Sequence, residues 1–205
     1  MEIKEILHFQ SRSDFRQWLS ENHSTAAVCW VALKKGKASA TAKLEMADAQ
    51  TEVADGKPNL AYLDAVEEAL CFGWIDSTQK THDGTTIQRF SPRKKGSPWS
   101  ELNKARCRRL ERLGLMTEAG RKALPDMSSD MKIDPDILSA FRANPQAWEN
   151  FRRFPALYQR VRIDTIQRDK HKGMETFHKR LRRLLEASAA GQMFGEWNDS
   201  GRLTE

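Results

Sequence analysis

Residues 74–92 read WIDSTQKTHDGTTIQRFSP, with Asp83-Gly84 at the centre of the segment. Asp-Gly favours a two-residue type I′ turn, in which both central residues adopt positive φ. Threonine, isoleucine and aromatic residues, which are common in β-strands, flank this dipeptide. The segment therefore predicts a β-hairpin.

The register of the hairpin follows from its turn. Counting outward from a tight turn pairs His82 with Thr85 and, further along, Asp76 with Ser91. Side chains alternate between the two faces of a strand. The predicted register therefore gathers one set of residues on a single face: Trp74, Asp76, Thr78, Arg89, Ser91 and Arg93.

The chain before the hairpin predicts a helix, a strand and a second helix. Apolar residues recur at helical spacing in residues 11–22 and 63–72, whereas residues 26–33 are apolar on both faces, as in a buried strand. Residues 34–57 contain few large apolar groups, which favours a solvated insertion. A short helix at 43–52, or a flexible loop or lid, is the alternative.

The chain after the hairpin is predicted to be helical. Ser97-Pro98 suits the start of a helix that runs to Leu113, and a short helix is expected at residues 117–124. Further helices are expected to begin at Asp134, Asn144, Pro155 and Gly173.

These elements predict the α+β class, with a small antiparallel β-sheet packed with helices and a helical C-terminal subdomain. The expected division is an α+β domain at 1–124, a linker at 125–134, a helical subdomain at 135–190 and a tail at 191–205.

The composition indicates the cellular compartment and the kind of partner to expect. The 205 residues include three widely spaced cysteines and no Cys-x-x-Cys pair, which favours a reducing compartment. Neither a secretory signal nor an apolar run of about 18 residues is visible, so we expect a cytoplasmic protein without a transmembrane segment. The formal charge of +6 favours anionic partners.

The sequence lacks several motifs that are typical of enzymes. It has no His-Glu-x-x-His zinc motif, no phosphate-binding glycine loop and no Gly-x-Ser-x-Gly elbow. Cys71 lies at the end of a predicted helix, where the helix dipole disfavours a thiolate. The sequence thus predicts no metal and no cofactor, and it favours a binding protein over an enzyme.

The predicted hairpin face is the first candidate site. Asp76 lies diagonally between Arg89 and Arg93 and beside Trp74. Guanidinium groups near an indole suit an anionic or planar ligand. The alternative is a cross-strand ion pair that only covers the sheet.

Basic segments supply the second candidate. Nine Lys and Arg residues lie between Arg89 and Arg112, interleaved with Phe90 and Trp99, as in surfaces that bind single-stranded nucleic acid. A solvated helix face is the alternative. The basic C-terminal helices are typical either of a membrane- or partner-binding element or of the outer helices of a bundle.

The segment DAVEEALCFGWID at residues 64–76 resembles the signature of the YdeI/OmpD-associated (bacteriocin-protection) family. Residues 88–93, 99–104 and 114–120 extend the resemblance, and Glu175-Thr176 with Arg180 and Leu181 is similar to the family's helical tail. The family name implies tolerance of stress and antimicrobial peptides, and the resemblance carries over no established reaction.

The family motif falls on the hairpin and on the start of the following helix. This resemblance implies a ligand site formed by Trp74, Asp76, Arg89, Phe90, Arg93, Trp99, Ser100 and Asn103. Arg89 and Arg93 would bind an anion, and Trp74 and Trp99 would form apolar walls. The leading hypothesis is a stress-tolerance protein that binds a small anionic ligand. The alternatives are sequence-tolerant nucleic-acid binding through residues 89–112 and an enzyme that acts on a small anionic substrate.

Overall fold

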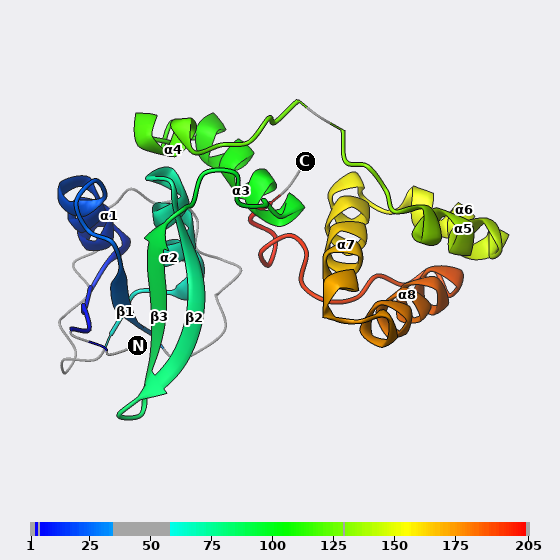
Figure 1. Ribbon diagram of the computed structural model, residues 1–205, viewed down its shortest axis with the longest axis horizontal. Helices are drawn as coiled ribbons and strands as arrows, with labels where there is room; N and C mark the ends of the chain where they lie inside the picture. Colours follow the sequence, from blue (N-terminus) through cyan, green and yellow to red (C-terminus); the bar gives the residue numbers. More distant parts are fainter. Residues whose placement is uncertain (1–2, 4, 35–57, 129, 204–205) are drawn as a thin grey trace. The chain divides into compact units, whose positions relative to one another are not determined.

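A computed structural model describes residues 3, 5–34, 58–128 and 130–203 (Figure 1). Most of the predicted insertion at 34–57 lies outside these residues. The chain divides into two compact units, one made of residues 1–97 and 106–125 and the other of 98–105 and 126–205. Residues 98–105 thus belong to the second unit, although the sequence suggested a boundary after residue 124.

The first unit contains a three-stranded antiparallel sheet. Its strands are β1 (Cys29–Leu33), β2 (Trp74–His82) and β3 (Thr85–Pro92), in the order β1-β3-β2 (Figure 1). All five residues of β1 are buried, as expected for a strand that is apolar on both faces. With the surrounding helices, this sheet confirms the predicted α+β class.

The hairpin turn is the one predicted. Asp83 and Gly84 have φ values of +46° and +73°, so both adopt the left-handed conformation that a type I′ turn requires. Next to the turn the register is also as predicted, since His82 pairs with Thr85.

Further from the turn the predicted register is wrong by one residue. Asp76 pairs with Phe90 rather than with Ser91. The cause is a bulge between Asp76 and Gln79, where two residues, Ser77 and Thr78, lie opposite Arg89 alone. An extra residue on one strand exchanges the faces of everything beyond it. Asp76 therefore shares its face with Phe90, and Arg89 lies on the other face.

As predicted, one helix precedes β1 and another follows it. Helix α1 (Arg12–Asn22) begins with a capping box formed by Ser11 and Asp14, and helix α2 (Tyr62–Cys71) ends just before Gly73, whose φ is +74°. We call the face of the sheet that carries Phe90 the inner face. The Phe15 and Phe90 rings lie 5.5 Å apart, so α1 covers this face.

Helix α3 (Glu101–Arg112) begins later than predicted. The hydroxyl of Ser100, rather than that of Ser97, accepts a hydrogen bond from the backbone of Asn103 at 3.1 Å. Ser97 and Pro98 thus precede the helix. The short helix α4 (Glu118–Lys122) follows, capped by Thr117.

The second unit is helical, as predicted. Its helices are α5 (Pro135–Arg142), α6 (Pro145–Arg153), α7 (Ala156–Arg168), the 3₁₀ helix η1 (Asp169–Lys172) and α8 (Met174–Ala189) (Figure 1). Phe141, Phe151, Tyr158 and Phe177 are buried together in its core. In a separate cluster, Leu102 of α3 packs against Leu157 and Val161 of α7.

None of the helices in the described ranges is long and apolar enough to cross a membrane.

Candidate functional site

The eight residues predicted to form a site fall into both units. Five of them, Trp74, Asp76, Arg89, Phe90 and Arg93, belong to the first unit. The other three, Trp99, Ser100 and Asn103, belong to the second unit.

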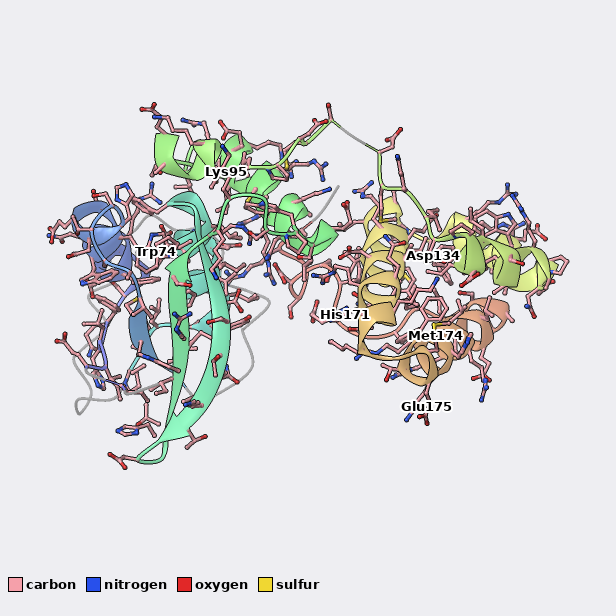
Figure 2. All side chains as sticks on the ribbon, in the orientation of Figure 1. Trp74, Lys95, Asp134, His171, Met174 and Glu175 are labelled. Carbon is pink, nitrogen blue, oxygen red and sulfur yellow. The ribbon has the colours of Figure 1, made fainter. Side chains whose placement is uncertain are left out.

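Trp74 and Phe90 serve the core of the first unit. Trp74, which lies at the end of the hairpin far from its turn (Figure 2), is 1 % exposed and meets Trp18 edge-on with ring centroids 5.9 Å apart. Its indole Nε1 donates to the carbonyl of His23 at 3.2 Å. Phe90 is fully buried. Both rings stabilise the unit by packing, and the indole hydrogen bond anchors Trp74 to the end of α1.

Asp76 lies on the same inner face in a polar environment. Its Oδ2 accepts a hydrogen bond from the hydroxyl of Tyr62 at 2.8 Å. Burial lowers the pKa of the Arg93 guanidinium, while the neighbouring Cys107 and Asp76 act in the opposite direction. Asp76 therefore interacts electrostatically with Arg93, and Tyr62 is a polar contact of Asp76 that the sequence did not indicate.

Arg89 lies on the outer face of the sheet, with different neighbours. Its Nη1 donates to Ser77 Oγ at 3.1 Å and to Ser91 Oγ at 3.3 Å. Its Nε is buried and has no hydrogen-bond partner. Arg89 itself is only partly buried, and among the described residues it forms no ion pair with a carboxylate.

An aromatic ring and a second cation belong to the same outer face. Trp30 of β1 lies directly opposite Arg89 in the sheet, and it is 5 % exposed. The ammonium of Lys80 lies 5.6 Å from the centre of the Trp30 ring. Arg89, Ser77, Ser91, Lys80 and Trp30 are called the Arg89 cluster below.

This geometry revises the predicted hairpin face. The bulge moves Arg89 and Ser91 to the face opposite Asp76, so the predicted set of one carboxylate between two arginines does not form. Asp76 still acts electrostatically on Arg93. The sequence could not indicate this difference, because a tight turn predicts an uninterrupted ladder.

In the second unit, the predicted residues lie at the start of α3. Ser100 caps the helix, while Trp99 and Asn103 are partly buried. Nearby, the buried carboxylate of Asp164 accepts a hydrogen bond from the backbone of Glu101 at 3.2 Å. Burial raises the pKa of Asp164, although Arg168, 3.1 Å away, opposes the shift. Within the second unit, this cluster joins the start of α3 to α7.

Two buried glutamates are the largest polar feature that the sequence did not reveal. Glu67 and Glu68 of α2 are 0 % and 1 % exposed. Arg12 contacts both of them, Arg16 contacts Glu68 at 2.7 Å, and Arg109 contacts Glu67 at 3.0 Å. Burial opposes the charge of Arg12, but the two carboxylates raise its pKa overall. The only sequence signal is that Arg12 and Arg16 lie one helical turn apart.

The basic segment at 89–112 does not form one free surface. Lys104 is paired with Glu101 at 2.8 Å, and Arg109 with Glu67. Arg106 is 7 % exposed. Much of this positive charge therefore has a structural role within its own unit.

No group of three or more His, Cys, Asp or Glu side chains suitable for a metal ion occurs among the residues that the structure describes.

These observations define an α+β protein whose hairpin carries a basic, hydroxyl-rich cluster on its outer face. Residues 130–191 match the family described as bacteriocin-protection, YdeI or OmpD-associated, which confirms the predicted family for this region. Residues 49–123, which include the hairpin, match a domain of unknown function, DUF8412. Neither a curated protein nor a solved structure matches the chain.

The resemblance to this family rests mainly on residues 64–76 and the hairpin, whereas the family match covers residues 130–191, in the helical second unit.

Proposed function

We propose that this protein binds a small anionic ligand at the Arg89 cluster, on the outer face of the hairpin. The observation that carries this proposal is that the Arg89 guanidinium contacts two serine hydroxyls and, in the described part of the chain, no carboxylate. A partly buried guanidinium whose neighbours are hydroxyl groups lacks a negatively charged acceptor, and an anion would supply one.

The hydrogen-bonding capacity of the cluster supports an anion. Ser91 accepts a hydrogen bond from Arg89, which leaves its own O–H group able to donate, whereas the Ser77 hydroxyl accepts from Arg89 Nη1 and donates to the Arg89 carbonyl at 3.5 Å. The other guanidinium nitrogen, Nη2, also has N–H donors. Lys80 adds a second positive charge. A phosphate or carboxylate could therefore accept from several donors at once.

The contacts of the two serines favour ligand binding over catalysis as the role of the Arg89 cluster. Within the described ranges, neither serine is hydrogen-bonded to a histidine or a carboxylate that would activate it as a nucleophile. Nucleic-acid binding through residues 89–112 is less well supported, because Lys104 and Arg109 are paired with glutamates.

The family description supports a biological setting for this activity. We propose that ligand binding serves tolerance of stress or antimicrobial peptides, which the match of residues 130–191 to a family named for bacteriocin protection supports. The proposed compartment is the cytoplasm, an expectation that rests on the sequence alone.

Thermal-shift assays with phosphate, citrate and nucleoside monophosphates test the proposal, because a ligand that binds only the folded state raises Tm. At least one anion should stabilise the protein and should lose its effect in Arg89→Ala. Arg153→Ala, an exposed arginine of α6, is the matched control and should retain the effect. An equal Tm increase in Arg89→Ala and in the wild type would place binding elsewhere.

A further inference from the structure

The outward face of α8 carries an unusual concentration of positive charge. A hollow of about 690 Å³ is lined by Thr176, Lys179, Arg180, Arg182, Arg183 and Glu186. Four of these side chains are cations and one is a carboxylate. All four cations are exposed.

Most of these cations have no carboxylate partner. Arg180 is paired with Asp169, but Lys179, Arg182 and Arg183 form no ion pair within residues 130–203. Some exposed cations elsewhere in the described ranges are paired with a carboxylate on their own helix. Lys122, for example, lies 2.7 Å from Glu118. The charge on α8 is therefore available to an external anion.

Arg183 is held in place by an aromatic ring. Its guanidinium carbon lies 4.4 Å from the centre of Phe194, and that of Arg162 lies 5.5 Å from the same ring. Arg162 also donates to the carbonyl of Glu196. Two arginines are thus kept beside one ring, which lowers the entropy that Arg183 loses on binding a partner.

The packing of α8 argues against insertion into a membrane. Its apolar side chains Phe177, Leu181 and Leu184 are buried in the core of the second unit. An amphipathic helix binds a bilayer by burying such a face in the lipid, and here that face is already occupied.

The lining of the hollow also argues against a peptide partner. Peptide and protein interfaces depend on apolar or aromatic anchors that fill a pocket. The six residues that line this hollow are all polar or charged. A phosphate backbone needs no such anchor, because charge neutralisation and release of counterions supply most of its binding free energy.

We propose that the α8 face binds nucleic acid through its phosphates, without reading the base sequence. Lys179, Arg182 and Arg183 supply the contacts, and Glu186 weakens them. This inference is independent of the Arg89 cluster, which belongs to the first unit.

Fluorescence anisotropy of a labelled single-stranded oligonucleotide of mixed sequence, measured with the whole protein over a range of salt, tests this proposal. The slope of log K against log[salt] should fall by about 0.7 per lost contact, hence by roughly two units in the triple variant Lys179→Gln, Arg182→Gln, Arg183→Gln. The triple variant Lys122→Gln, Lys132→Gln, Arg153→Gln loses the same charge from exposed positions elsewhere and should keep the wild-type slope.

A second variant should strengthen oligonucleotide binding rather than weaken it. Glu186→Gln removes the one carboxylate of the hollow and should tighten oligonucleotide binding several-fold at low salt. The proposal is overturned if no binding occurs at low salt, or if the α8 variants match the wild type. Equal affinity for polyglutamate or for anionic phosphatidylserine vesicles would also overturn it.

Discussion

Arg89 of β3 donates a hydrogen bond to Ser77 of β2 at 3.1 Å, across the point where two residues of one strand oppose one of the other. The bulge thus brings a serine hydroxyl to the guanidinium and separates Arg89 from Asp76. β-Bulges frequently redirect side chains next to binding sites. This relationship is the structural basis of the proposed anion site.

The two serines of the Arg89 cluster should contribute to ligand affinity. Ser77→Ala and Ser91→Ala each remove one hydroxyl that accepts a hydrogen bond from Arg89, and a hydrogen bond of this kind is worth about 0.5–1.5 kcal/mol. Each change should weaken binding of the stabilising anion roughly 2- to 10-fold in isothermal titration calorimetry. Ser139→Ala in the second unit is the control and should leave the affinity unchanged. Unchanged affinity in both cluster variants would mean that the ligand does not contact the hydroxyls.

The buried glutamates should be important for stability. Glu67→Ala leaves Arg12 and Arg109 without a carboxylate that they now contact, and breaking a buried ion pair costs about 3–5 kcal/mol. Urea denaturation should show a loss of this order. Glu118→Ala breaks an exposed pair with Lys122 and should cost less than about 1 kcal/mol. Similar losses in the two variants would show that the buried cluster is energetically unimportant.

Asp164 should make stability depend on pH. Its pKa is raised in the folded state above the ordinary value of 3.8, so the folded protein binds the proton more tightly than the unfolded chain. The free energy of unfolding should therefore decrease as pH rises from the ordinary to the raised pKa. The difference in stability between the wild type and Asp164→Asn, measured from pH 3 to 7, should show this decrease. Ser139→Ala, at an exposed position without a titratable group, should not show it. A pH-independent difference for Asp164→Asn would contradict the assignment.

The cysteines should be unreactive in the folded protein. Burial raises the pKa of Cys29, Cys71 and Cys107 to about 12, and all three are free thiols. At pH 8 only about one thiol in ten thousand is then ionised. Labelling with a thiol-specific disulfide reagent should be slow without denaturant and rapid in urea. Fast labelling of the native protein would contradict the burial of at least one thiol.

Structural elements that depend on residues adjacent in the sequence were predictable from it. The Asp83-Gly84 turn was predicted because its dihedral angles are a local requirement, and α1 and α2 were predicted from their apolar spacing and end signals. The α3 start was misplaced because Ser97 and Ser100 are both plausible caps in a linear sequence.

Features that depend on distant contacts were not predictable. The bulge at Ser77 and Thr78 exchanged the faces of Arg89 and Asp76, and no local turn or breaker residue marks it. The burial of Glu67 and Glu68 depends on Arg12 and Arg16, more than fifty residues away. A helix pattern shows that a face is polar but not that an oppositely charged helix will cover it.

The most direct test of the central claim is the NMR signal of the Arg89 side chain during an anion titration. The Nε–Hε resonance of Arg89, assigned by its loss in Arg89→Lys, should shift in a saturable manner as the stabilising anion is added. The resonance of Arg153 should stay in place, because this arginine is exposed and paired with Glu149. If the anion raises Tm while the Arg89 resonance does not move, the ligand binds elsewhere and the proposed function of the Arg89 cluster is wrong.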